Sequence, residues 1–230
     1  EPVLYLDNPK GVPPELRKAM LNGVQSVNKA HLATKGDPEI ASRISQYETA
    51  FRMQSSVPDL LAIEKEPQHV IDLYGKDVQR PGSFARNCLL ARRLVERGTR
   101  VVQLMHSGWD QHGNLSTQLA EQCRDTDQPA AALVKDLEQR GLLDDTIVLW
   151  MSEFGRTVFG QGDINASSGY GRDHLGSVYS VWAAGGGFKK GLVYGKSDDF
   201  AYNVAENPVH VHDLQATLLN QFGIDHRQLT

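Results

Sequence analysis

The sequence predicts an α/β protein in which helices cover a mostly parallel β-sheet. Two short apolar stretches, residues 100–106 and 146–151, each follow a longer segment with helical periodicity. Strands that are apolar along their whole length are typical of a parallel sheet buried between two layers of helices. Because such strands point the same way, the loops at their carboxyl ends should meet at one edge of the sheet.

The first third of the chain is predicted to be helical. Residues 13–33 and 37–56 carry apolar side chains at spacings of three and four, and a proline stands at the first turn of each segment. Asp37 is a candidate N-cap of the second segment. We expect two packed helices here, within a helical segment spanning residues 1–82 that shares one compact domain with the rest of the chain.

Residues 83–230 form the predicted α/β core. Ser83 can cap a helix that ends at a glycine directly before the first strand. A long helix over about residues 116–140 precedes the second strand, TIVLWMSEFG. The third strand, SVYSVWAAGGG, follows a loop rich in glycine and serine. The last predicted helix, HDLQATLLNQFGI, has Asp213 or His212 as its cap.

Composition and charge argue against several classes of function. The net charge of −4 and the sequence pI near 6.1 give no basic field for the phosphate backbone, so no nucleic-acid partner is expected. No apolar run approaches the ~18 residues that span a bilayer, and the first residues lack the order of a signal peptide. Cys88 and Cys123 lie in predicted helices, far apart in sequence, and are expected to be buried free thiols.

Polar side chains with metal-binding chemistry follow the predicted strands. Asp110 and His112 come directly after the first strand, Glu153 ends the second, and the loop before the third contains Asp173 and His174. Carboxylate oxygen and imidazole nitrogen suit zinc, manganese and related ions, and mixed Asp/His sites can hold two ions. The sequence therefore predicts a site for one or two divalent ions, zinc or manganese first, with calcium or magnesium as alternatives.

Two arginines stand beside these predicted ligands and indicate anion binding. Arg156 and Arg172 each carry a planar guanidinium, which binds phosphate or sulfate through paired N–H groups. His106, at the end of the first strand, and His212, at the start of the last helix, are weaker candidates for the same site.

Each signal also has a purely structural interpretation. An Asp-x-His after a strand is commonly a turn with a solvated imidazole, and Glu153 can simply pair with Arg156. His106 fits a core-facing strand residue, and His212 fits a capping or surface histidine. The metal prediction therefore depends on three segments meeting at one edge. No Gly-x-Ser-x-Gly motif is present and neither cysteine has an adjacent base, so these residues reveal no protein nucleophile.

Four stretches of the chain are specific enough to indicate a family. They are CLLARRLVERGTRVVQLMHSGWDQHGN, DQPAAALVKDLEQRGLLDDTIVLWMSEFGRT, GRDHLG and AGGGFKKGLVYGKSDDFAYNVAENPVHVHDLQATLLNQFGID. Together they resemble the domain of unknown function 1501 family, sulfatase-like proteins of the alkaline phosphatase superfamily, from about residue 12 to the C-terminus. The resemblance implies a three-layer alkaline phosphatase-like fold with a metal site at the strand ends. Because family members often begin with an export signal, it also suggests an exported bacterial protein.

The resemblance assigns roles to the predicted ligands. Asp110 and His112 fit the first ligand pair of the superfamily, with a shorter spacing than usual. Glu153 takes the acidic position, and His174, with Asp173 beside it, fits the last.

The chain departs from the superfamily pattern in two ways. Phe154 stands where the superfamily commonly has a histidine, which removes one expected ligand. The nucleophile and first metal carboxylate of the superfamily lie on an early strand, and this chain begins after it. We therefore expect a C-terminal portion or a shortened member, with a sheet incomplete at its N-terminal side.

The predicted function is metal-dependent hydrolysis of phosphate or sulfate esters, on a small-molecule or glycan substrate. The catalytic residue is unassigned, because the nucleophile-bearing region is not in this chain. The alternative is a non-catalytic, metal-stabilised binding or surface module derived from the same fold, and an isomerase or phosphotransferase is a third reading. The sequence makes no prediction of the oligomeric state.

Overall fold

The computed structural model describes residues 8–163, 165 and 169–229 of the 230-residue chain. The chain divides into two compact units, Glu1–Lys65 and Glu66–Thr230. The boundary predicted after residue 82 therefore falls inside the second unit, because the short helix and turn that precede residue 82 pack on the helices that follow it.

The first unit is a pair of helices with a short turn at its end. Helix α1, Pro14–Lys35, packs against α2, Pro38–Leu61, and a 3-10 turn, Ile63–Lys65, follows. The chain reverses at Gly36, whose φ of 67° is a conformation that side chains disfavour. Asp37 accepts a hydrogen bond from the Glu39 amide at 2.9 Å, so the predicted cap is confirmed.

The second unit begins with helices that supply its core. They are α3, Gln68–Tyr74; a 3-10 turn, Lys76–Gln79; α4, Phe84–Glu96; and α5, Leu115–Gln139. Side chains buried between them include Tyr74, Val78, Cys88, Leu89 and Leu137. The predicted helix at 116–140 and its predecessor are confirmed, and Ser83 caps α4 by accepting from the Arg86 amide.

A buried network of charges joins α4 to α5. Arg92, only 1% exposed, contacts Glu66 at 2.7 Å, Glu96 at 2.6 Å and Asp136 at 2.8 Å. Burial would lower the pKa of Arg92, but its hydrogen bonds to Glu66 and Glu96 outweigh burial and raise it. The core of this unit therefore lies among helices, with an ion-pair network at its centre.

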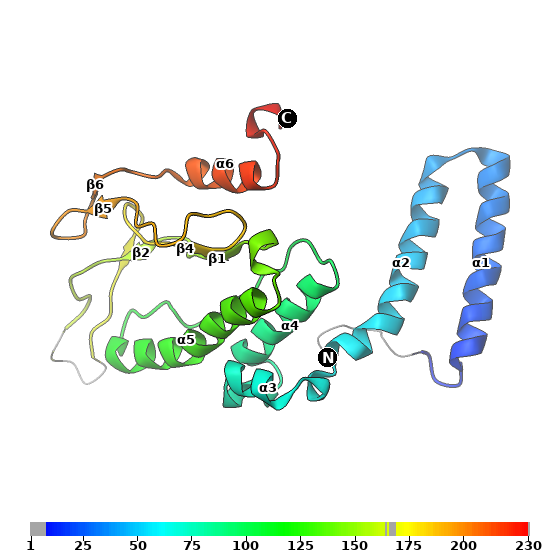
Figure 1. The fold of residues 1–230 in the computed structure, drawn as a ribbon, viewed down its shortest axis with the longest axis horizontal. Coiled ribbons are helices and arrows are strands. Elements are labelled where there is room, and N and C mark those ends of the chain that lie inside the picture. Colours follow the sequence, from blue (N-terminus) through cyan, green and yellow to red (C-terminus); the bar gives the residue numbers. More distant parts are fainter. Residues whose placement is uncertain (1–7, 164, 166–168, 230) are drawn as a thin grey trace. The chain divides into compact units, whose positions relative to one another are not determined.

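The described strands form three antiparallel pairs. β1, Val148–Trp150, pairs with β4, Trp182–Ala184; β2, Gly155–Arg156, with β3, His174–Leu175; and β5, Lys196–Ser197, with β6, Val204–Glu206. Figure 1 shows β1 and β4 between α5 and α4 on one side and α6 on the other. The parallel sheet of a three-layer alkaline phosphatase-like fold stays a prediction.

Residues 100–106 form no strand, unlike the prediction from their apolar pattern. A strand needs a hydrogen-bonded neighbour, and none of the described residues pairs with this segment along a ladder. Val101 is 80% exposed and Met105 is 79% exposed. Val102 and Leu104 are half-buried, so only one face of this segment is covered and the other is open to solvent.

The chain ends with helix α6, Val211–Gln221, and a 3-10 turn, His226–Gln228. The cap of α6 is His210, whose Nδ1 accepts from the His212 amide, while Asp213 accepts from the His210 amide at 2.8 Å. Naming Asp213 or His212 as the cap was wrong by three or two positions, because the helix begins at Val211, and Asp213 instead completes the capping box at N3. None of the described helices is long and apolar enough to cross a membrane.

Candidate metal centre

The loop before α5 holds Asp110 and His112 on one side of the backbone. The residue between them, Gln111, points the other way: it is 4% exposed and donates to the Gly108 carbonyl at 2.6 Å. The His112 amide donates to the Asp110 carbonyl at 3.1 Å, which tightens the turn. Both functional side chains are therefore directed outward together from a short, anchored segment.

A second segment, residues 169–172, packs directly on this loop. The Arg172 amide donates to the Gln111 carbonyl at 2.9 Å, and the Leu115 amide donates to the Tyr170 carbonyl at 3.0 Å. A Cβ at Gly171 would lie 2.0 Å from the carbonyl carbon of His112, so only glycine permits this approach. The contact joins parts of the chain that are far apart in sequence.

The β2–β3 hairpin then brings in the remaining side chains. Arg156 and His174 stand opposite each other in the antiparallel register, so their side chains share one face. Thr157 supports the hairpin from its buried side, because its hydroxyl accepts from the Asp173 amide at 3.1 Å. The pairing thus presents a guanidinium and an imidazole to the loop that carries Asp110.

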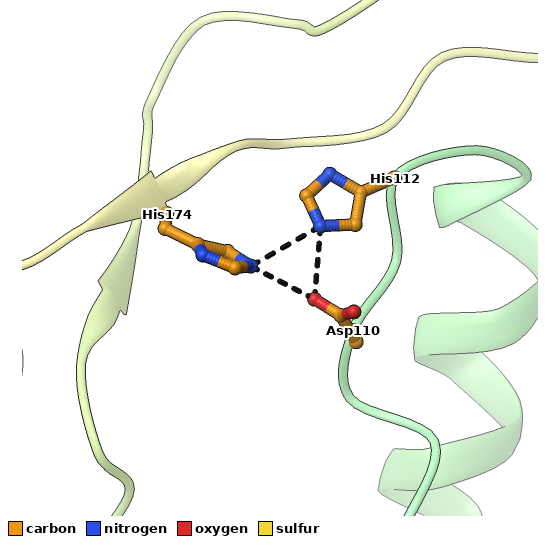
Figure 2. A group of neighbouring side chains, drawn as sticks. All are labelled: Asp110, His112 and His174. Atoms are coloured by element: carbon orange, nitrogen blue, oxygen red, sulfur yellow. Dashed lines mark hydrogen bonds and ion pairs between the residues drawn. The ribbon is translucent and has the colours of Figure 1, made fainter.

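Asp110, His112 and His174 form a compact triangle of ligand atoms, drawn in Figure 2. Asp110 Oδ1 lies 3.0 Å from Nε2 of each histidine, and the two Nε2 atoms are 3.1 Å apart. Ligand atoms bonded to one ion at about 2.0–2.2 Å lie roughly 3.0–3.5 Å from one another, at octahedral or tetrahedral angles. The donor set and its spacing therefore fit a single divalent transition-metal ion.

The protons available in this triangle support the same interpretation. His112 Nδ1 lies 2.5 Å from Gln161 Oε1, and in the tautomer that donates its Nδ1 proton to this oxygen, Nε2 carries a lone pair. The His112 lone pair then faces two other acceptor positions, Asp110 Oδ1 and Nε2 of His174. Even if His174 Nε2 carries a proton, that proton can be donated to Asp110 or to His112, but not to both at full strength. A cation at the centre of the triangle, or a second proton on His112, would resolve the shortage.

Arg156 shares the carboxylate of this triangle. Its Nη2 donates to Asp110 Oδ1 at 2.6 Å, the same oxygen that faces both histidines. The hydrogen bonds from Arg156 and then from His174 lower the pKa of Asp110 to about 2. Asp110 is therefore ionised at neutral pH, as a metal ligand must be.

Phe154, which stands at the position of an expected histidine ligand, lies against the site. Its ring centroid is 4.3 Å from that of His174, and the Arg156 guanidinium carbon lies 5.7 Å from the Phe154 centroid. The aromatic ring thus backs both an imidazole and a guanidinium. It supplies no donor atom for an ion.

Three other predicted site residues lie near the triangle without joining it. Among the described side chains, the group that can share one ion contains neither Glu153 nor Asp173. Glu153 accepts from the Ser152 hydroxyl at 2.9 Å, and its pKa is lowered first by its own backbone amide. Asp173 accepts from the His174 amide at 2.8 Å. Arg172 reaches the site through its carbonyl, which accepts from Arg156 at 3.4 Å.

The weaker histidine candidates have other surroundings. His106 accepts from Trp109 Nε1 at 2.9 Å and packs edge-on against Phe84 at 5.2 Å. This agrees with the structural interpretation of His106, although no strand holds it. His212 is exposed on the first turn of α6, with its ring 4.7 Å from that of His210. Neither histidine belongs to the Asp110 group.

Two residues that contribute to the site were not named in the prediction from the sequence. Gln161 orients His112 from 49 residues away, and Gly171 permits the close approach of the two segments. Both depend on the antiparallel bridge that pairs Gln161 with Gly171. Only the glycine carried a signal, since it lies in the GYGRDHLG stretch beside the predicted ligands.

Comparison with known proteins identifies one family. The model of a family described as "Protein of unknown function (DUF1501)" matches residues 1–230. No curated protein and no solved structure matches the chain.

Proposed function

The chain belongs to the DUF1501 family, and we propose that it is a metal-dependent hydrolase of phosphate or sulfate esters. One observation carries the proposal: Asp110, His112 and His174 direct three ligand atoms, all within 4.8 Å of one another, at a common point. The resemblance of its motifs to sulfatase-like proteins of the alkaline phosphatase superfamily supports ester hydrolysis over other uses of an ion.

The ligand set favours zinc or manganese over calcium or magnesium. Two imidazole nitrogens and one carboxylate oxygen suit transition metals, whereas calcium and magnesium prefer oxygen ligands. When bound, such an ion would polarise the ester oxygens and lower the pKa of a water molecule.

The chain's own residues would bind and orient the ester. Arg156 lies beside the triangle with its second nitrogen, Nη1, held at the Arg172 carbonyl. A guanidinium in that place can bind two oxygens of a phosphate or sulfate group. Gln161 would keep Nε2 of His112 unprotonated by accepting the Nδ1 proton. The nucleophile is not assigned to a residue of this chain.

The exposure of the ligands favours a second candidate, a metal-stabilised binding or surface module. The side chains of His112, His174 and Asp110 are 38%, 46% and 69% exposed. Catalytic sites gain electrostatic strength by excluding water, and an ion held by exposed ligands can instead pin two segments together. In this reading the ion would join the loop before α5 to the β2–β3 hairpin.

Metal content is the first test of both candidates. The purified chain and an Asp110→Ala, His174→Ala double variant would be analysed for bound elements after equilibration with zinc or manganese. We expect close to one ion per chain, lost in the double variant. A His31→Ala, Asp127→Ala variant removes the same residue types from exposed positions elsewhere and should keep the ion. Equal metal content in all three proteins would refute the site.

Turnover separates the two candidates. The loaded chain would be assayed with 4-nitrophenyl phosphate and 4-nitrophenyl sulfate, with the double variant as the blank. Release of 4-nitrophenol that disappears in the double variant supports the hydrolase. Metal binding that raises the melting temperature without any turnover would favour the binding module.

A further inference from the structure

We propose that Arg156 and the metal ion compete for the Asp110 carboxylate, so that ion binding releases the guanidinium to hold the anionic group of the substrate. The inference rests on the proposed function, because it needs an ion at the triangle of Asp110, His112 and His174. It adds a coupling between two ligands: the anion site is completed only when the ion is in place.

The competition follows from the atoms involved. Arg156 Nη2 lies 2.6 Å from Asp110 Oδ1, and this is the oxygen that both histidines face at 3.0 Å. A carboxylate oxygen has two lone pairs, and the hydrogen bonds from Arg156 and His174 use both, so an ion can bond to this oxygen only by displacing a donor. In the free chain Arg156 therefore supplies the positive charge that the ion would otherwise supply.

A divalent ion bonded to that oxygen would repel the guanidinium. The repulsion grows with the product of the two charges and falls with the distance between them and with the local dielectric constant. The Asp110 side chain is 69% exposed, whereas Arg156 is 23% exposed and is also held through Nη1 at the Arg172 carbonyl. The interaction that ion binding would break is therefore the single hydrogen bond from Arg156 Nη2 to Asp110 Oδ1.

The freed guanidinium would stay beside the ion. Its other nitrogen, Nη1, donates to the Arg172 carbonyl at 3.4 Å, and the Phe154 ring lies 5.7 Å from its central carbon. The pairing of Arg156 with His174 in the β2–β3 register fixes the backbone on the same face as the ligands. Nη2 then has an unused N–H beside a cation, which is the arrangement that binds an oxyanion.

Thermodynamic linkage gives the exchange a measurable signature. If ion binding frees Arg156 for the anion, the anion must raise the affinity for the ion by the same factor. Removing the guanidinium should have two opposite effects: the ion binds more tightly without the anion, because a competitor is gone, and the anion loses its effect.

Isothermal titration with manganese(II) chloride tests this directly. The full chain, an Arg156→Gln variant and an Arg156→Lys variant would be titrated in sodium chloride and in sodium sulfate of equal ionic strength. For the wild-type chain we expect sulfate to tighten manganese binding. For Arg156→Gln we expect binding in chloride to be about fivefold tighter or more, with no further gain from sulfate. Arg156→Lys, which keeps the charge but not the fork, should lie between the two.

An Arg172→Gln variant is the control for a general charge effect. It removes the same charge from a neighbour whose side chain makes no described hydrogen bond with Asp110. An equal gain in this variant and in Arg156→Gln would overturn the exchange, as would unchanged or weaker manganese binding in Arg156→Gln. If the wild-type chain binds no manganese or zinc, both the exchange and the proposed hydrolase fail. If it binds the ion through Asp110 and His174 while Arg156→Gln behaves as wild type, the exchange alone fails.

Discussion

Arg92 of α4 donates through Nε to Asp136 of α5 across 2.8 Å, with both side chains buried. The same carboxylate accepts from the Tyr74 hydroxyl at 3.0 Å, and Arg140 contacts its other oxygen at 2.7 Å. Helices α3, α4 and α5 are therefore joined at the carboxyl group of Asp136. The stability of the second unit should depend strongly on this point.

Replacing Arg92 by methionine should destabilise the second unit by about 3–5 kcal/mol, because it leaves buried carboxylates without their cation. The free energy of unfolding from urea titrations followed by circular dichroism measures the effect. Arg227→Met is the control: its partner Asp225 is a neighbour in an exposed turn, and we expect a far smaller loss than for Arg92→Met. Similar losses in the two variants would show that the network contributes little.

Glu66 should make the stability depend on acid pH. Burial raises the pKa of Glu66, but Arg92 and Arg93 lower it more, so its pKa in the folded chain is below the ordinary 4.5. The stabilisation is therefore complete above about pH 4.5 and is lost as the pH falls through the lower folded value. Unfolding free energies measured from pH 7 to about pH 3 should fall less steeply for Glu66→Gln than for the wild type. Parallel curves would contradict the assignment.

The two cysteines should differ sharply in reactivity. Burial raises the pKa of the Cys88 thiol to about 12, whereas Cys123 is exposed. The prediction of two buried thiols was thus right for Cys88 and wrong for Cys123, since every residue from 116 to 125 is exposed or half-buried. Iodoacetamide at neutral pH should label one thiol per native chain, and Cys123→Ser should abolish that labelling. Rapid labelling of two thiols would count against the packing of α4.

Gly171→Ala should weaken metal binding without changing any ligand. The new Cβ would lie 2.0 Å from the backbone of His112 and push the two segments of the site apart. We expect a loss of affinity of about tenfold or more, as for other changes that displace ligands indirectly. Gly176→Ala is a matched control, because a Cβ there meets no atom within 4 Å. Unchanged zinc or manganese affinity in Gly171→Ala would show that the close approach is not needed.

The helices were predictable because their signals are local. Asp37 and Ser83 cap the helices that their positions indicated, and the apolar spacing placed α5 to within a residue at each end. The strands were harder to predict, since a strand forms only when it pairs with another segment elsewhere in the chain. Residues 100–106 have a strand's composition, yet among the described residues no neighbour pairs with them.

The candidate site was predictable only in part, because some of its signals are local in the sequence and others are not. Asp110 and His112 are close in sequence, and the residue types of the GYGRDHLG stretch suggested His174 as their partner. The roles of the residues within the site could not be predicted from the sequence, because they depend on the register of the hairpin. That register places Arg156 against Asp110 instead of Glu153, and Gln161 against His112. A carboxylate such as Glu153 can stand beside a site in sequence and still turn toward its own neighbour, Ser152.

All three tryptophans of the chain lie in one cluster beside the Asp110 loop. The ring centroids of Trp109 and Trp150 are 6.3 Å apart, and Trp150 stacks on Trp182 across the β1–β4 pair at 6.0 Å. The tryptophan emission of this 230-residue chain therefore originates from a single cluster, next to the residue that would bind the ion. Intrinsic tryptophan fluorescence therefore reports on the surroundings of the Asp110 loop, while the α1–α2 unit contributes no tryptophan signal.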